Sequence, residues 1–230
     1  MQKIGVIGGL SWVSTADYYR RLNQMTQGRL GGVASARLVI ESVNRQDYVD
    51  AVIDRQDEAA ACEIIRDAAV SLQKAGADFL VISCNDVHRF VPELEPSLSI
   101  PFLHIAEATA DAIIADGFNK VALMGVRKTM EGDFYPRILK ARGIETLIPD
   151  DDERSYIHDS IYNELVKDIF TDETRAGYVG LIERFRQRGA RGTILGCTEI
   201  PLLIRDGDTE VPTYSTTELH CRAAVARAMG

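Results

Sequence analysis

Short apolar runs alternate with longer polar stretches along the chain. The runs KIGVIG, ARLVIES, DFLVISC, KVALMG and GTILGC are rich in Ile, Val and Leu and have the length of buried strands. The stretches DEAAACEIIRDAAVSLQKAG and RAGYVGLIERFRQRGA carry apolar residues three to four positions apart. Near its end each has a glycine soon after Lys or Arg, which is typical of a helix C-terminus. This alternation predicts an α/β fold in which mainly parallel sheets are flanked by helices.

The chain also resembles itself in two places. KIGVIGGLSWVSTADYYRRL is similar to KVALMGVRKTMEGDFYPRIL, and LQKAGADFLVISCND is similar to FRQRGARGTILGCTE. Any two βα units share an apolar strand and a glycine, but two pairs in the same order and at nearly the same offset favour a duplication. We therefore expect two pseudo-symmetric α/β domains, residues 1–100 plus 209–230 and residues 101–208. The C-terminal helix TTELHCRAAVARAM is expected to return to the first domain.

Composition narrows the class of partner. A formal charge of -8 and a pI near 5.1 over 230 residues argue against a nucleic acid or an anionic membrane surface. The N-terminus lacks a signal-peptide pattern and no window approaches 18 apolar residues, so we expect a cytoplasmic protein that binds a small molecule. The four cysteines lie far apart without a CxxC pair, which signals neither a metal site nor a disulfide.

Cys84 and Cys197 each follow a predicted buried strand, 113 residues apart. Ligands of parallel α/β sheets bind at the carboxyl ends of the strands, so the two thiols are expected on opposite sides of a cleft between the domains. A lone buried cysteine is usually part of a core. Two at equivalent strand ends favour an acid–base pair that inverts a stereocentre, one as thiolate and one as thiol, with a free enzyme that exists in two mirror forms.

The segments GGLSWVST, SCNDVH, LHIAEAT, GDFY and GCTEI resemble the aspartate/glutamate racemase family over nearly the whole chain. The resemblance implies that Cys84 and Cys197 are the catalytic pair, that no cofactor or metal is used, and that the protein is a homodimer. It implies interconversion of L- and D-aspartate, with glutamate as a further substrate. The substrate-binding residues that it implies are Leu10, Ser11, Asn85 and Thr198 at the α-carboxylate, and Lys167 with either Arg45 or Arg55 at the side-chain carboxylate.

Several other polar residues lie near the cysteines in the sequence. Asp86 stands where the family pattern usually has Thr, and its carboxylate would repel a substrate carboxylate unless it is protonated, turned away or paired with a cation. If Asp86 faces the site, it could instead bind the substrate ammonium or shift the preference away from acidic amino acids. Asp86 and Glu199 are therefore further candidate substrate-binding residues, with Glu199 ahead of Glu41. His88 either orients a group of the site or is a satisfied structural residue, and the other three histidines receive no role.

Other functions remain open on the sequence alone. The run GVIGG has the spacing GxxGG rather than GxGxxG, which disfavours a dinucleotide site. No lysine has a recognisable pyridoxal-phosphate context. The alternatives to the racemase are a maleate isomerase, a hydantoin-type racemase or a decarboxylase, or an amino-acid binding protein without turnover.

Overall fold

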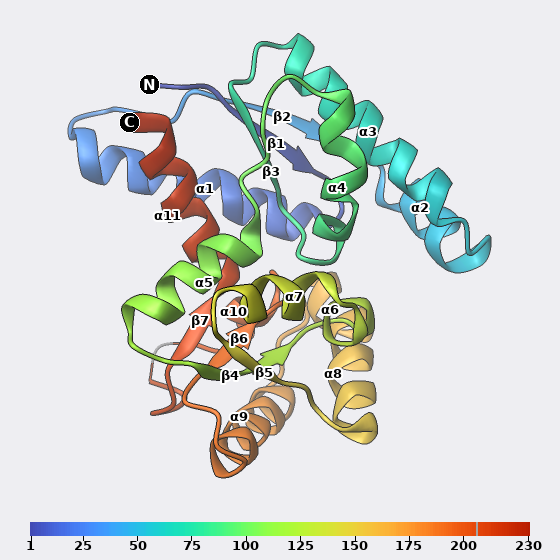
Figure 1. The fold of residues 1–230 in the computed structure, drawn as a ribbon, viewed down its shortest axis with the longest axis vertical. Coiled ribbons are helices and arrows are strands. Elements are labelled where there is room, and N and C mark those ends of the chain that lie inside the picture. The colour runs from blue at the N-terminus through green and yellow to red at the C-terminus, as the bar shows by residue number, and fades with distance from the viewer. Residues whose placement is uncertain (206) are drawn as a thin grey trace. The chain divides into compact units, whose positions relative to one another are not determined.

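The computed structural model describes residues 1–205 and 207–230, and the chain divides into two compact units (Figure 1). Unit 1 comprises Met1–His104 and His220–Gly230, and unit 2 comprises Ile105–Leu219. Each unit is built on a parallel sheet flanked by helices, which confirms the predicted α/β class. None of the helices in the described part of the chain has the length and apolar content that a bilayer-spanning helix requires.

The sheet of unit 1 has the strand order β2-β1-β3, with β1 in the centre. Its strands are β1 (Ile4–Gly8), β2 (Leu38–Ser42) and β3 (Phe79–Ile82). The principal helices are α1 (Trp12–Leu30), α2 (Arg45–Val49), α3 (Glu58–Lys74), α4 (Val91–Leu94) and α11 (Thr216–Met229). Short segments of other geometry are the π-helix η1 (Asp50–Asp54) and the 3-10 helices η2 (Asp86–Phe90) and η3 (Glu95–Ser97).

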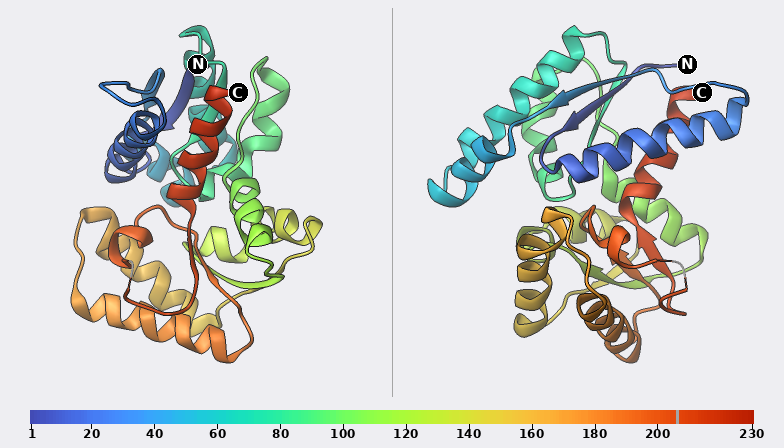
Figure 2. Two further views of the ribbon diagram at one scale, coloured as in Figure 1. Left: turned by 90° about the vertical axis from the view of Figure 1, so that its left-hand side faces the viewer. Right: turned by 180° about the vertical axis from the view of Figure 1, so that it is seen from behind.

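Alternate residues of the central strand enter opposite layers of the core of unit 1. Ile7 packs with α3 and α4, whereas Ile4 and Val6 pack with α1 and with the part of α11 that belongs to this unit. Figure 2 shows α1 running beside the sheet. Because both faces of β1 are covered, its sequence reads as a continuous apolar run rather than as an alternating one. The C-terminal helix therefore packs on the first unit, as predicted.

Unit 2 repeats this plan with one more strand, in the order β5-β4-β6-β7. Its strands are β4 (Lys120–Met124), β5 (Glu145–Leu147), β6 (Thr193–Leu195) and β7 (Thr213–Ser215). Its helices are α5 (Ile105–Ala115), α6 (Arg127–Glu131), α7 (Phe134–Ala141), α8 (Asp151–Asn163), η4 (Leu165–Lys167), α9 (Asp172–Gln187) and α10 (Ile200–Leu203). Ala122 and Met124 face α8, α9 and α10, and Val121 and Leu123 face α5 and α7.

The two sheets share their topology. In each, the first strand is central, the second strand lies on one side and the third strand on the other. The counterpart of β7 in unit 1 is an isolated parallel bridge between Leu80 and Phe102. The helix that follows this bridge, α5, packs on the sheet of unit 2, and the helix that follows β7, α11, packs on the sheet of unit 1.

The observed division differs from the expected one at both boundaries. Residues 209–219 belong to unit 2 rather than to the first domain, because β7 pairs with β6 inside that stretch. The first crossing lies after His104 rather than after residue 100, because the bridge at Phe102 attaches this segment to β3.

Candidate active site

A tight loop follows β1 and carries two of the predicted binding residues, Leu10 and Ser11. Gly9 begins it with a φ of +83°, and a Cβ at this position would lie 2.0 Å from the carbonyl oxygen of Val43. Only glycine fits this backbone. Ser11 is the N-cap of α1, and its Oγ accepts a hydrogen bond from the Ser14 amide at 3.4 Å. Leu10 and Ser11 are both buried, so the loop has one defined position.

A threonine joins this loop to the end of β3. Thr15 Oγ1 accepts a hydrogen bond from the Gly9 amide at 2.9 Å and donates one to the Ser11 carbonyl at 2.8 Å. The same hydroxyl lies 3.2 Å from Ser83 Oγ, and Cys84 is the next residue. Cys84 is half-buried. The network therefore fixes the backbone at this cysteine relative to the loop.

The structure separates the two candidate arginines. Arg45, at the start of α2, donates from Nη1 to the Leu10 carbonyl at 2.8 Å and is half-buried. Arg55 is exposed at the end of η1. Of the two, Arg45 is the one that the structure brings to the loop.

Asp86 is paired with a cation. Its Oδ2 lies 2.5 Å from Nη1 of Arg89, and it accepts a hydrogen bond from the Tyr48 hydroxyl at 3.3 Å. The side chains of Asp86 and Arg89 are only 13% and 15% exposed. Arg89 also pairs with Glu58 at 2.7 Å. To avoid repelling a substrate carboxylate, Asp86 has to be protonated, turned away or paired with a cation. The structure shows that it is paired with a cation. Burial, with the negative charge of Asp86, raises the pKa of Tyr48.

His88 is attached to the backbone of Cys84. Its Nδ1 lies 2.8 Å from the Cys84 carbonyl oxygen, and because a carbonyl only accepts, Nδ1 carries the hydrogen. The side chain is fully buried. Its ring centroid is 4.8 Å from that of His104 and 5.4 Å from that of His220. Burial, reinforced by these two rings, lowers the pKa of His88 well below its ordinary value, so the imidazole is neutral.

His220 links three segments of unit 1. Its Nδ1 lies 2.9 Å from the Tyr18 hydroxyl on α1, and its Nε2 lies 2.8 Å from the Leu103 carbonyl oxygen. Burial lowers the pKa of His220 to about 4. Over residues 1–205 and 207–230, no three His, Cys, Asp or Glu side chains are grouped so as to hold a metal ion.

In unit 2, Cys197 follows the third strand in the same way as Cys84 does in unit 1. The Gly196 amide donates to the Met124 carbonyl at 2.7 Å, which joins the ends of β6 and β4. A Cβ on Gly125 would lie 2.8 Å from the Gly196 carbonyl oxygen, so the two backbones approach as closely as glycine allows. Cys197 thus stands, half-buried, at the carboxyl edge of this sheet.

The side chains of Cys197, Thr198 and Glu199 form a connected group. The Cys197 thiol and the Thr198 hydroxyl each donate to Glu199 Oε2, both at 3.0 Å. Glu199 is 2% exposed and Thr198 is 3% exposed. Asn85, the counterpart of Thr198 in unit 1, is 2% exposed. A carboxylate that accepts from a thiol can hold that thiol's proton, so Glu199 contacts a predicted catalytic group directly.

Lys167 has an exposed side chain at the end of η4. The two residues before it, Leu165 and Val166, belong to the hydrophobic cluster that also includes Cys197. The backbone leaves this short helix through Asp168, which has a φ of +62°. The lysine therefore stands on a segment that is anchored to the cluster containing Cys197.

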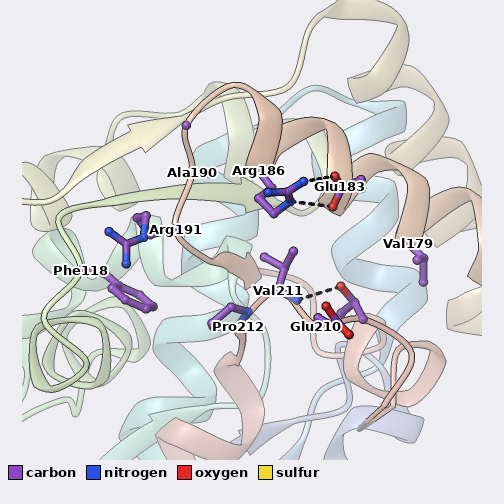
Figure 3. Close-up of a pocket in the computed structure, with 11 residues that line it drawn as sticks. Phe118, Val179, Glu183, Arg186, Ala190, Arg191, Glu210, Val211 and Pro212 are labelled. Atoms are coloured by element: carbon purple, nitrogen blue, oxygen red, sulfur yellow. Dashed lines mark hydrogen bonds and ion pairs between the residues drawn. The ribbon is translucent and has the colours of Figure 1, made fainter.

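A cavity of about 820 Å³ lies elsewhere on unit 2 (Figure 3). Phe118, Arg191 and Pro212 line it, and they precede β4, β6 and β7 respectively. The cavity therefore opens at the amino edge of the parallel sheet, opposite the edge that carries Cys197. Arg186, which also lines the cavity, is paired with Glu183 at 2.6 Å. The described residues of this cavity include none of the predicted site residues.

Sequence reasoning missed two residues that surround Asp86. Arg89 comes three positions after Asp86, a spacing that places both on one side of a helical turn, so this ion pair had a signal in the sequence. Tyr48 lies 38 positions before Asp86 and carries no such signal.

Comparison with known proteins identifies relatives over the full length of the chain. The family model for Asp/Glu/hydantoin racemases matches residues 7–224. Broad specificity amino-acid racemase RacX of Bacillus subtilis strain 168 is 26% identical over 230 residues, which span 97% of this chain and 96% of RacX. A crystal structure from Yersinia pestis with an Asp/Glu racemase assignment is 38% identical, with a TM-score of 0.91 and full coverage of both chains. The structure of an aspartate racemase homologue from Pyrococcus horikoshii OT3 is 31% identical, with a TM-score of 0.87 and full coverage of both. The chain belongs to the Asp/Glu/hydantoin racemase family.

Proposed function

We propose that this protein is an amino-acid racemase that interconverts L- and D-aspartate, with glutamate as a further substrate. The observation that carries the proposal is the equivalent placement of Cys84 and Cys197, each two residues past the end of the third strand of its sheet. The family membership supports the reaction class. The aspartate racemase homologue at 31% identity supports the choice of substrate, and the broad specificity relative argues for testing a panel of amino acids.

The proposed reaction is two-base proton transfer. One cysteine, as thiolate, removes the α-proton of the amino acid, and the other, as thiol, delivers a proton to the opposite face of the resulting carbanion. In the reverse direction the two sulfurs exchange roles, so the overall reaction consumes no proton and needs no cofactor. That both thiols serve one substrate molecule stays a prediction.

The remaining polar residues are assigned to binding. The buried side chains of Asn85 and Thr198 are proposed to hold the α-carboxylate, together with amides of the loop at Leu10 and Ser11. Arg45 and Lys167 are proposed to meet the side-chain carboxylate. Binding both carboxylates fixes the α-carbon relative to the two sulfurs, which a proton transfer over hydrogen-bond distance requires.

Chiral chromatography of L-amino acids incubated with the protein in D2O tests this function. We expect D-aspartate to form with deuterium at the α-carbon, and we expect Cys84→Ala and Cys197→Ala each to abolish inversion. Cys62→Ala is the matched control, because Cys62 is a buried thiol on α3. Full racemisation in both site variants would overturn the proposal. If only a 5-substituted hydantoin were inverted, the protein would be a hydantoin racemase and not an aspartate racemase. Tight binding of aspartate without exchange of its α-proton would indicate a binding protein.

The family resemblance also supports a homodimer and a cytoplasmic location. Light scattering of the purified protein and fractionation of the source cells measure these two properties. A monomeric, fully active enzyme would contradict the first.

A further inference from the structure

Each of the two cysteines is followed, two residues later, by a carboxylate. Asp86 holds this position after Cys84, and Glu199 holds it after Cys197. The strands before the cysteines are equivalent in the two sheets, so the two carboxylates are equivalent in the duplication. Their interactions nevertheless differ.

In unit 2, the carboxylate accepts the thiol hydrogen. The Cys197 sulfur lies 3.0 Å from Glu199 Oε2, and Glu199 is 2% exposed. Deprotonation of this thiol would replace a hydrogen bond with two negative charges in contact, and the charge of Glu199 is shielded from water that could screen it. Glu199 therefore stabilises the protonated form of Cys197.

In unit 1, the equivalent carboxylate has its charge compensated. Arg89 binds Asp86 Oδ2 at 2.5 Å, donates to the Asp86 carbonyl at 3.1 Å, and is 15% exposed. The Tyr48 hydroxyl donates to the same carboxylate oxygen. Glu58 also binds Arg89, but its side chain is 44% exposed, so solvent screens its charge. The partly buried guanidinium of Arg89 offsets the negative charge of Asp86, which would oppose a thiolate at Cys84.

We propose that these two carboxylates give the cysteines opposite resting states, with Cys197 held as a thiol by Glu199 and Cys84 left as the thiolate by the Asp86–Arg89 pair. This inference rests on the proposed function. Glu199 and Arg89 act here as positioning residues, through the sulfurs that react. The free enzyme then exists mainly in one of the two mirror forms that a two-cysteine mechanism allows.

The proton balance follows from this resting state. A turnover that starts from it moves the α-proton to the Cys84 sulfur and moves the Cys197 proton to the carbanion. To return, Cys84 releases one proton to solvent and Cys197 takes one up. L- and D-aspartate have equal free energies in water, so kcat/KM is the same in both directions, and the asymmetry is visible in the reactivity of the two thiols.

Alkylation of the intact free protein with iodoacetamide, followed peptide by peptide as a function of pH, tests the proposal, because the reagent attacks only the thiolate. We expect the Cys84 rate to reach its plateau at lower pH than the Cys197 rate. Glu199→Gln keeps an acceptor but removes the charge, so the Cys197 rate at pH 7 should rise roughly tenfold, the change that one pH unit in the midpoint produces. The Cys84 profile should not move.

Arg89→Gln should shift the Cys84 profile to higher pH and leave the Cys197 profile in place. The conservative variants Glu199→Asp and Arg89→Lys keep each charge and should restore most of the wild-type profiles. Matched controls are Glu183→Gln, on α9 at the amino edge of its sheet, and Arg37→Gln, which is exposed in unit 1. Circular dichroism of every variant checks that it is folded.

Coincident profiles for the two cysteines in the wild type would overturn the inference, as would an unchanged Cys197 profile in folded Glu199→Gln. Because alkylation needs no turnover, these results are independent of the racemase assay. Racemase activity with coincident profiles would support the proposed function and contradict the inference. Displaced profiles without racemisation would support opposite protonation states of the two cysteines and contradict the proposed function.

Discussion

At the scale of single residues, the loop after β1 depends on the absence of one carbon atom. A Cβ on Gly9 would lie 2.0 Å from the Val43 carbonyl oxygen, and its φ of +83° already disfavours any other residue. Gly31, at the end of α1, has a similar φ of +76° but open space around its Cα. Comparing substitutions at Gly9 and Gly31 therefore distinguishes the cost of backbone strain from the cost of a steric clash.

We expect Gly9→Ala to lower the free energy of unfolding by about 3 kcal/mol or more, and Gly31→Ala by about 1 kcal/mol, since the second carries the strain alone. Urea denaturation measures both. Racemisation should fall in Gly9→Ala, because the loop carries Leu10 and Ser11. Equal losses of stability in Gly9→Ala and Gly31→Ala would contradict a steric clash between residue 9 and the Val43 carbonyl oxygen.

Two arginines offer a matched test of substrate binding. Arg45 donates to the loop carbonyl of Leu10, whereas Arg55 is exposed at the end of η1. Removing a cation that meets a substrate carboxylate costs about 2 kcal/mol or more, which corresponds to a loss of about thirtyfold. We expect Arg45→Met to reduce kcat/KM for aspartate by this factor and Arg55→Met to leave it near the wild-type value.

Lys167→Ala extends this test, because it should reduce turnover of aspartate while sparing that of alanine, which has no side-chain carboxylate. A reversed ranking of the two arginine variants would assign the contact to Arg55. Equal losses on aspartate and alanine in Lys167→Ala would remove the lysine from the side-chain site.

The sequence predicts part of this site at residue scale. Each apolar run stops at its cysteine, which places both thiols at strand ends. The ion pair between Asp86 and Arg89 was not predicted, although their spacing of three residues is a signal for it. Tyr48 and the histidines at 88, 104 and 220 come together only through the tertiary fold, from positions far apart in the chain. No local pattern encodes such contacts.

At the scale of elements, His220 joins α11 to α1 and to the segment before α5. Its two ring nitrogens contact Tyr18 and Leu103, and the imidazole is neutral because burial lowers its pKa to about 4. In the unfolded chain a histidine titrates near 6.5. Between these two values the unfolded state binds a proton that the folded state does not, so folding stability falls as the pH decreases from about 7 towards 4.

This contribution amounts to roughly 3 kcal/mol across the interval, since one pKa unit corresponds to 1.36 kcal/mol. The lowered pKa of His88 acts in the same direction. We expect the free energy of unfolding of His220→Gln to depend less steeply on pH than that of the wild type, although it is smaller at pH 7. Denaturation series at half-unit pH steps measure both slopes. Parallel slopes would show that His220 does not carry this dependence.

The elements were predicted unevenly for physical reasons. Five of the strands and the helices α3 and α9 were predicted from the spacing of their apolar residues and from the glycines near their ends. The strands β5 and β7 have three residues each, too few for a period to appear, and both lie at the edges of their sheet. Missing β7 also misplaced the second domain boundary, because its pairing with β6 assigns residues 209–219 to unit 2.

At the scale of the whole molecule, unit 1 is made from two separate parts of the chain and unit 2 from one. The apolar face of α11 covers β1 and β3 through Cys221, Ala224, Val225 and Ala228. The Gln2 amide also donates to the Ala228 carbonyl at 2.8 Å. One layer of the core of unit 1, which α1 and α11 share, is therefore incomplete until residues 220–230 are in place.

We expect a chain that ends at Leu219 to lose structure in unit 1 and to keep it in unit 2. Hydrogen exchange followed by mass spectrometry should show fast exchange in β1 and β3 and wild-type protection in β4 and β6, because the core of unit 2 lies within residues 105–219. The full-length chain is the reference. Wild-type protection of β1 in the shortened chain would contradict this division.

The return of α11 to β1 also determines when each unit can fold during protein synthesis. Residues 105–219 form one continuous stretch, so every segment of unit 2 is synthesised before residues 220–230. The first unit, although translated first, waits for the last eleven residues of the chain. Its strands lack the cover of α11 through that interval, and exposed apolar surface of this kind favours aggregation.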